Sequence, residues 1–244
     1  MDWVNKHLQI VPINTFIDPI FPVENAIITH AHADHAKPGH NNVLATKHTI
    51  EIMKIRYGEN CANNFQELSF NSPLQINGVK VTFFPAGHIL GSTQVLLEYQ
   101  KDKINFTGDF KITKDDTCEN FRPVTCDTLV TEATFGLPIF QHPDPEIEIN
   151  KLINSLKKFS KRPHLIGVYA LGKAQRLIKL LRNKGYDETI FIHGALEKIC
   201  DYYIQSGISL GNLSKALIKG EKKDFNGKII LAPPSALKFG SIIL

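Results

Sequence analysis

Four side chains able to bind metal lie within six residues of one another: His30, His32, Asp34 and His35. They follow an apolar stretch, residues 26–28, that is typical of a buried strand. Side chains alternate along a strand, so His30 and His32 are expected to point the same way. Asp34 and His35 lie beyond the strand and are free to turn toward a second point. The spacing therefore favours two adjacent metal ions over one ion, and over histidines that bind nothing.

Two further ligand-type residues follow later predicted strands. His88 lies between Gly87 and Gly91, and glycines allow close approach of the backbone. Asp109 follows Gly108. Either residue alone is weak evidence, because a Gly-Asp pair is usually only a turn. Together with the first group they lie at the ends of successive strands, which a β-sandwich brings to one edge.

The residue types indicate the chemistry. Neutral imidazoles and carboxylates suit zinc or manganese. We expect His30, His32 and His88 to hold one divalent ion, Asp34 and His35 to hold a second, and Asp109 to bridge the two. Two such ions clamp a phosphodiester and lower the pKa of a bound water to about 7. Asp34 is also expected to orient the attacking water, and Asp109 to take part in catalysis as the bridge.

The elements that would position these residues divide the chain in two. In the first part, Val79, Val81 and Phe83 alternate with polar residues, which predicts a strand. Further strands are predicted at residues 94–99, 104–107 and 127–131, and a helix at 46–57 that ends at Gly58. After Asp144-Pro145, a helix start, strands at 164–169, 189–192 and 228–231 alternate with helices at 172–184 and 195–205. We predict a mixed α/β protein with domains at 1–140 and 141–244, the boundary falling near 137–145.

Composition agrees with an ordinary globular chain of 244 residues, 43% of them hydrophobic. The formal net charge of +4 permits a polyanionic substrate but does not require one. Four cysteines without a CxxC pair indicate free thiols in a reducing compartment. The first residues contain no long apolar stretch, so we expect no secretory leader, and no apolar run approaches the ~18 residues of a membrane helix. We expect a cytoplasmic protein with no membrane partner.

The pattern HxHxDH resembles the signature of the metallo-β-lactamase superfamily, which implies an αββα sandwich. Residues 131–136 resemble the acidic motif that opens the β-CASP insert of nucleic-acid-processing members, and residues 170–176 are similar to a strand-to-helix turn of that insert. Asp18 matches the first Asp motif. The resemblance implies that Asp18 and Glu132 fix ligand histidines, Glu132 also serving catalysis. Lys173 and Arg176 are then phosphate contacts beside helix N-terminal N–H groups.

Within the superfamily, residues from about 16 to 236 most resemble bacterial ligase-associated DNA exonucleases. These are encoded beside an ATP-dependent DNA ligase and a helicase, and some related sequences are labelled mRNA 3′-end processing factors. The resemblance implies a two-metal phosphodiesterase that acts on nucleic acid, DNA preferred. We expect a DNA exonuclease of ligation and repair, functionally associated with a ligase and a helicase.

One departure concerns the C-terminal end. Related nucleases carry a further His motif after the β-CASP insert, and no such motif follows Pro233. We therefore expect a C-terminally truncated chain with an incomplete sandwich, the start of a return segment, and a second metal held less tightly than the first. Three alternatives stay open: an RNA-processing nuclease, a small-molecule metallo-hydrolase such as a lactonase or thioesterase, and an inactive protein that still binds nucleic acid.

Overall fold

The computed structural model describes residues 3–216 and 224–238, and the chain divides into two compact units. The first unit is Met1–Thr134 and the second is Phe135–Leu244. The division lies a few residues before the range 137–145 expected from the sequence. The last residues of the tail, 239–244, lie outside the described residues.

The first sheet of unit 1 has five strands in the order β1-β2-β3-β4-β5. Only β1 and β2 are antiparallel, and the later pairs are parallel. Parallel pairing brings the carboxyl ends of β2, β3 and β4 to the same edge, where the metal-ligand run begins. The strands are Gln9–Ile10, Thr15–Ile17, Asn25–Ile27, His40–Ala45 and Ala62–Glu67.

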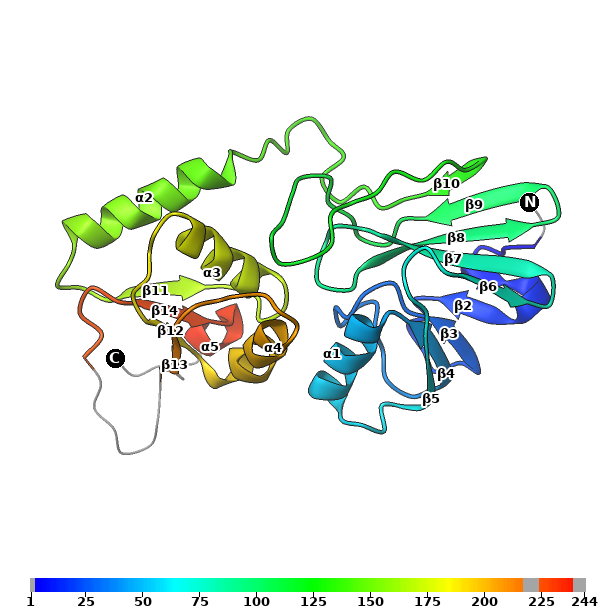
Figure 1. Ribbon diagram of the computed structural model, residues 1–244, viewed down its shortest axis with the longest axis horizontal. Helices are drawn as coiled ribbons and strands as arrows, with labels where there is room; N and C mark the ends of the chain where they lie inside the picture. The colour runs from blue at the N-terminus through cyan, green and yellow to red at the C-terminus, as the bar shows by residue number, and fades with distance from the viewer. Residues whose placement is uncertain (1–2, 217–223, 239–244) are drawn as a thin grey trace. The chain divides into compact units, whose positions relative to one another are not determined.

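The second sheet of unit 1 has the order β10-β9-β8-β7-β6. From β6 to β9, each strand pairs antiparallel with the next strand along the chain, and β10 pairs parallel to β9. Figure 1 shows the two sheets as two layers. The strands of the second sheet are Pro73–Ile76, Val79–Pro85, Thr93–Tyr99, Asp102–Phe106 and Thr128–Val130.

The core of unit 1 fills the space between these two layers. Strand β7 contributes Val79, Val81 and Phe83, the three residues whose alternation predicted it, and all are fully buried. Residues Ile27 and Leu44 of the first sheet belong to the same cluster. Two sheets that share one apolar core form a sandwich. The predicted α/β class with a sandwich domain is confirmed.

Helix α1 (Lys47–Tyr57) lies beside the first sheet (Figure 1). Thr46 caps its start by accepting a hydrogen bond from Thr49 N at 3.2 Å, and Gly58, with a φ of 93°, ends it. A side-chain cap at one end and a glycine at the other are the usual limits of a helix. Both limits agree with the sequence prediction to within one residue.

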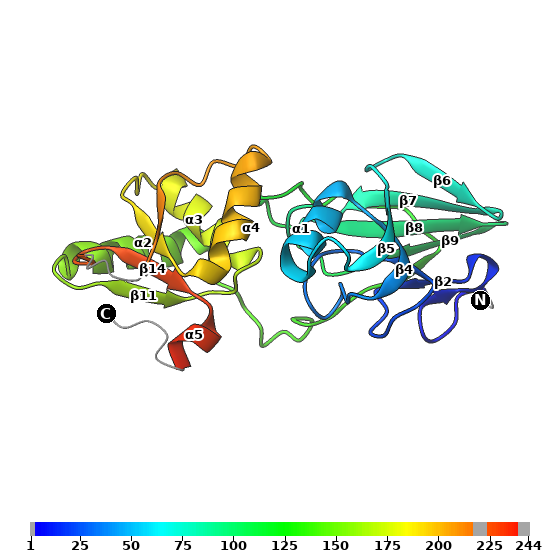
Figure 2. The same ribbon diagram turned by 90° about the horizontal axis from the view of Figure 1, so that it is seen from below.

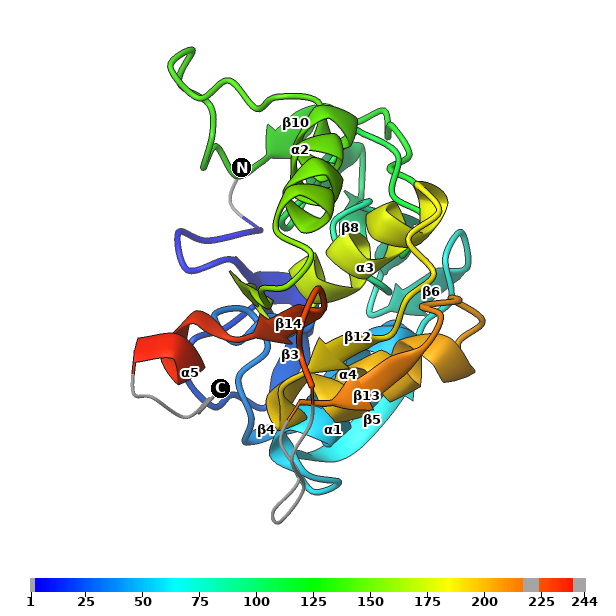
Figure 3. The ribbon, with the colours of Figure 1, turned by 90° about the vertical axis from the view of Figure 1, so that its left-hand side faces the viewer.

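Unit 2 is built on a four-stranded parallel sheet in the order β11-β14-β12-β13. Figure 3 shows β14, β12 and β13 side by side, and Figure 2 shows α2, α3 and α4 grouped together with α5 apart from them. The strands are His164–Gly167, Ile190–Ile192, Leu213–Lys215 and Ile229–Ala232. The helices are Pro145–Lys158, Lys173–Asn183, Gly194–Gln205 and Pro234–Lys238.

Strands β1, β2, β4, β5, β6 and β13 were not predicted from the sequence. Strands β4 and β5 are rich in asparagine, which is rare in strands. The structure pairs these amides between neighbouring strands, with Asn64 donating to Asn42 at 2.9 Å and Asn42 donating to Asn25 at 3.0 Å. This pairing satisfies side chains that would otherwise disfavour the sheet. Among the described helices, none is both long and apolar enough to cross a membrane.

Truncation of a core side chain tests this architecture. Leu97 of β8 is fully buried in the sandwich core, so Leu97→Ala should lower the free energy of unfolding of unit 1 by about 2–5 kcal/mol. The single tryptophan, Trp3, packs in the same core with its ring centre 5.4 Å from that of Tyr99, so its fluorescence reports this unit. Urea unfolding followed by Trp3 emission gives the value.

The matched control is Leu129→Ala in β10, whose side chain is 56% exposed. It should change the stability by less than about 1 kcal/mol. Equal losses for the two variants would contradict the assignment of the core.

Candidate metal centre

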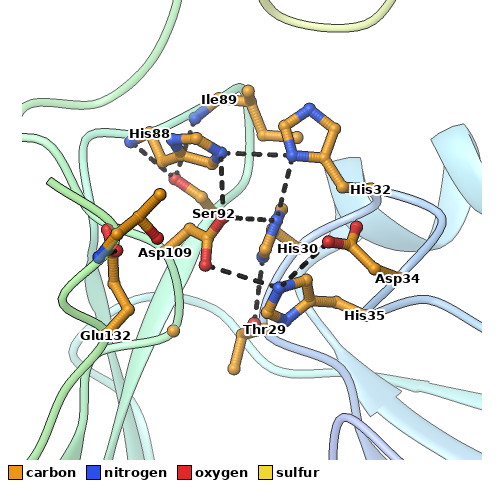
Figure 4. Close-up of polar contacts among 12 residues, drawn as sticks. Thr29, His30, His32, Asp34, His35, His88, Ile89, Ser92, Asp109 and Glu132 are labelled. Carbon is orange, nitrogen blue, oxygen red and sulfur yellow. Dashed lines mark hydrogen bonds and ion pairs between the residues drawn. The ribbon is translucent and has the colours of Figure 1, made fainter. Parts of the chain in front are cut away.

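Three loops meet at one end of the sandwich in unit 1. The run from His30 to His35 follows β3, His88 lies between β7 and β8, and Asp109 follows β9. Figure 4 shows the side chains of these loops turned toward one another. The convergence predicted from strand ends is therefore present in the structure.

Three imidazoles and a carboxylate form the first group. His32 Nδ1 lies 3.0 Å from His30 Nε2 and 3.1 Å from His88 Nε2. Asp109 Oδ2 lies 3.8 Å from His30 Nε2 and 3.6 Å from His88 Nε2 (Figure 4). His30 is almost completely buried, and the other three are partly exposed.

These separations fit a metal ion. Zinc binds four ligands as a tetrahedron with bonds of about 2.0–2.1 Å, which places the ligand atoms roughly 3.3 Å apart. The observed values, 3.0–3.8 Å, bracket that spacing. The donor set of three imidazole nitrogens and one carboxylate oxygen also suits zinc or manganese. His30, His32, His88 and Asp109 would hold the ion.

The second group faces the other oxygen of Asp109. Asp109 Oδ1 lies 3.4 Å from His35 Nε2, and Asp34 Oδ2 lies 3.9 Å from the same nitrogen. The Asp34 side chain is 80% exposed, at the solvent side of the group. Asp109 is therefore shared between the two groups, as a bridging ligand would be.

Asp18 supports this arrangement from behind. Its Oδ2 lies 2.8 Å from His35 Nδ1 and accepts from Thr29 Oγ1 at 2.6 Å, while Oδ1 accepts from Thr29 N at 2.7 Å. With both oxygens engaged, Asp18 is better suited to orient His35 than to bind an ion itself. The hydrogen bond to Nδ1 leaves Nε2 of His35 directed at Asp109 and Asp34.

The electrostatics of the two groups differ. Burial, together with the neighbouring imidazoles, lowers the pKa of His30 well below its usual value, and burial lowers the pKa of His88 to about 4. Burial also opposes protonation of His35, but hydrogen bonds to Asp109 and Asp18 outweigh it and raise its pKa to about 10. His30 and His88 are thus neutral and ready for an ion at pH 7, whereas His35 carries a proton.

Several supporting residues were not predicted. Ser92 Oγ accepts hydrogen bonds from His88 N at 3.0 Å and Ile89 N at 3.2 Å, which shapes the turn that carries His88. The guanidinium of Arg56 donates to the carbonyl of Ala31, between two ligand histidines. The Gly91-Ser92 pair, close to His88 in the sequence, could have indicated the contacts of Ser92. The Arg56 contact joins residues 25 positions apart, and nothing local in the sequence indicates it.

Glu132 lies beside Asp109 in Figure 4. Its Oε2 accepts a hydrogen bond from Thr134 N at 2.9 Å. The expected hydrogen bond with a ligand histidine is not among its described contacts. Its negative charge nevertheless acts to raise the pKa of His88, against the stronger effect of burial. Its assignment as a residue that fixes ligand histidines stays a prediction.

Lys173 and Arg176 belong to unit 2, in the first turn of α3. The Lys173 ammonium lies 5.2 Å from the ring centre of Tyr169. Gln175 caps the turn, with its Oε1 accepting from Gly172 N at 2.8 Å, so one backbone donor of the expected phosphate site is already used. The role of these two cations as phosphate contacts also stays a prediction.

The proton on His35 makes ion binding dependent on pH. An ion at Nε2 must displace that proton, so the apparent affinity for the second Mn²⁺ should rise with pH, by roughly tenfold per unit between pH 6 and 8. Calorimetric titration in buffers of different ionisation enthalpy measures both the affinity and the protons released. Asp18→Asn removes one of the two carboxylates that stabilise the proton and should make the dependence shallower. An affinity that does not change with pH would contradict this assignment.

Similar proteins were found by sequence. The chain is 27% identical over 238 residues to a probable DNA ligase of Opitutus terrae, matching 94% of this chain and 22% of that protein. It is 34% identical over 145 residues to the endoribonuclease ysh1 of Aspergillus fumigatus, covering 57% of this chain and 16% of the relative. Subunit 3 of the cleavage and polyadenylation specificity factor of Dictyostelium discoideum is 32% identical over 143 residues, covering 57% and 17%. The chain thus spans only about a fifth of the length of these relatives.

Among solved structures, a protein of unknown function from Enterococcus faecalis V583 superposes with a TM-score of 0.55 at 12% identity, covering 85% of this chain and 57% of that one. That likeness concerns the fold alone. A family model described as the beta-lactamase superfamily domain matches residues 2–149, more than half of the chain. With the HxHxDH side chains gathered at the end of the sandwich, the chain belongs to the metallo-β-lactamase superfamily.

Proposed function

We propose that this chain carries the two-metal centre of a phosphodiesterase that hydrolyses DNA, as an exonuclease of DNA ligation and repair. The metal ions are zinc or manganese, and the ligands are His30, His32 and His88 for the first ion, Asp34 and His35 for the second, and Asp109 between them.

The position of the Asp109 carboxylate carries this proposal. One oxygen lies 3.6–3.8 Å from two imidazoles of the first group and the other lies 3.4 Å from His35. A carboxylate shared in this way suits two ions about 3.5–4 Å apart, the spacing of enzymes that displace groups at phosphorus. A site for a single ion would not use His35 and Asp34 as ligands.

The residues would divide the work as follows. When bound, the ions supply a water of lowered pKa and stabilise the charge that develops on the phosphate. The exposed Asp34 carboxylate, beside His35, is suited to accept a hydrogen bond from the attacking water. Asp18 keeps His35 in one orientation, and Glu132 adds a negative charge near His88. The buried His30 holds its ion away from bulk water.

The relatives support nucleic acid as the substrate, and the one that matches nearly the whole chain supports DNA. That relative is named a probable DNA ligase, and 94% of this chain matches it. Association with an ATP-dependent ligase and a helicase is part of the same proposal. So is a cytoplasmic location, which agrees with cysteines that are all free thiols.

RNA is the second candidate substrate. Two relatives with higher identity over a shorter segment are named as an endoribonuclease and as a polyadenylation factor subunit. The metal ligands are common to both activities, so they do not separate DNA from RNA. Contacts with the 2′-hydroxyl would decide between the two substrates.

Matched oligonucleotides test the proposal. The chain is incubated with end-labelled single-stranded DNA, double-stranded DNA and RNA of one sequence, with Mn²⁺, with Zn²⁺ and with chelator. We expect metal-dependent shortening from an end, faster on DNA than on RNA. Asp109→Asn should reduce the rate by roughly 100-fold or more, since even outer partners of metal ligands cost 10–100-fold. Glu98→Gln, in the ion pair with Lys80 on β7 and β8, is the control and should keep the rate.

Each other outcome points to a different function. Faster cleavage of RNA would favour the RNA-processing alternative. Binding of DNA without cleavage would favour an inactive nucleic-acid-binding protein. No effect on any nucleic acid, together with hydrolysis of a lactone or thioester, would favour a small-molecule hydrolase. An unchanged rate in Asp109→Asn would contradict the proposed centre itself.

A further inference from the structure

The segment after Asp109 has neither helix nor strand up to β10, yet it is held firmly against the loop that carries His88. Lys111 N donates to Ala86 O at 3.0 Å, and Arg122 N donates to Pro85 O at 3.2 Å. Gly91 N donates to Glu119 Oε2 at 3.3 Å. The backbone that carries the bridging carboxylate and the loop that carries a ligand of the first group are therefore joined at several points.

The close approach of the two segments depends on a glycine, Gly87. A Cβ atom at Gly87 would lie 2.3 Å from Lys111 O and 2.9 Å from Phe121 N, both backbone atoms, and the φ of Gly87 is +73°. A side chain at this position would force the two segments apart. Lys111 and its neighbours thus pack backbone against backbone with the residue before His88.

A buried ion pair fixes this segment internally. The Lys111 ammonium contacts Asp115 Oδ2, with side chains that are 18% and 4% exposed. Asp115 Oδ1 also accepts from Thr117 N at 2.9 Å and Thr117 Oγ1 at 2.6 Å. Burial acts to raise the pKa of Asp115, but Lys111 and Thr117 hold it below its usual value. Loss of the Lys111 ammonium would remove the cation that offsets the buried Asp115 charge, which costs stability.

We propose that Lys111, through its ion pair with Asp115, is a positioning residue that sets the bridging carboxylate of Asp109 and thereby controls affinity for the second metal ion. This inference rests on the two-metal centre proposed above. Lys111 lies two residues after Asp109, and its own N–H is bonded to the His88 loop. Its ammonium is occupied by Asp115, so a role in holding the backbone fits better than a direct contact with phosphate.

If the Asp109 carboxylate is held less precisely, the affinities for the two ions should change by different amounts. The first ion retains three imidazoles when the carboxylate moves. The second retains only His35 and the exposed Asp34, so Asp109 is a larger part of its ligand set. A general loss of stability would lower the affinities for both ions alike. A loss of the positioning role would lower the affinity for the second ion selectively.

Lys111→Gln tests the inference by titration with Mn²⁺, free Mn²⁺ being measured by electron paramagnetic resonance. We expect the affinity for the second ion to fall roughly 10-fold or more, the range for lost support of a metal ligand. The affinity for the first ion should change less than threefold, as a rough limit. Lys111→Arg keeps the charge and should recover most of the loss. Lys80→Gln removes a more exposed ion pair, with Glu98 on β7 and β8, and should leave both affinities unchanged.

Trp3 fluorescence first shows that each variant is folded at the temperature of the titration. If Lys111→Gln is not, Asp115→Asn takes its place and must show the same selective loss. Two ions bound by Lys111→Gln as tightly as by the wild type would overturn the inference and leave the proposed function standing. Equal weakening of both ions would overturn it as well. A wild-type chain that binds only one ion would overturn the proposed centre together with the inference.

Discussion

The carboxylate of Asp18 accepts three hydrogen bonds at the edge of the first sheet, and the geometry of the metal centre depends on them. Two come from the backbone and hydroxyl of Thr29, immediately before the ligand run, and the third joins it to His35. Thr29 in turn accepts from Thr93 N of the second sheet at 2.9 Å. One largely buried carboxylate therefore ties together the ends of β2 and β3, the second sheet, and a candidate metal ligand. Asp18 makes these contacts from a backbone conformation with φ +45°, which Asp tolerates better than most residues.

The two groups of side chains beside this anchor differ in their protonation. The imidazoles of His30, His32 and His88 gather in one group, and burial favours the neutral form of His30 and His88, so this group is ready to bind. His35 lies between the carboxylates of Asp18 and Asp109, which favour its charged form. An ion competes with a proton there but not at His30 or His88. This difference, more than the number of ligands, would make the affinity for the second ion depend on pH and on small movements of Asp109.

The sequence predicted the parts of the fold that local pattern controls. The alternating strand at Val79–Pro85 and the capped helix at Lys47–Tyr57 appear as expected. Strands β4 and β5 were missed because their asparagines are satisfied only by partners on neighbouring strands. Asp34, His35 and Asp109 were assigned from spacing, and the structure brings Asp34 and Asp109 each within 4 Å of His35 Nε2. The support from Ser92, Arg56 and the Lys111–Asp115 pair lies in loops and in contacts between distant residues, where sequence periodicity carries no information.

Membership of the metallo-β-lactamase superfamily agrees with the cluster of His and Asp side chains, but the number of ions is the central claim of the proposed function. The most direct measurement is a crystal structure of the Mn²⁺-soaked protein with anomalous scattering recorded at the manganese edge. Our account predicts two peaks about 3.5–4 Å apart, one among His30, His32 and His88 and one beside His35 and Asp34, with the Asp109 carboxylate between them. A single peak among the three imidazoles, with His35 still bonded to both Asp18 and Asp109, would contradict it.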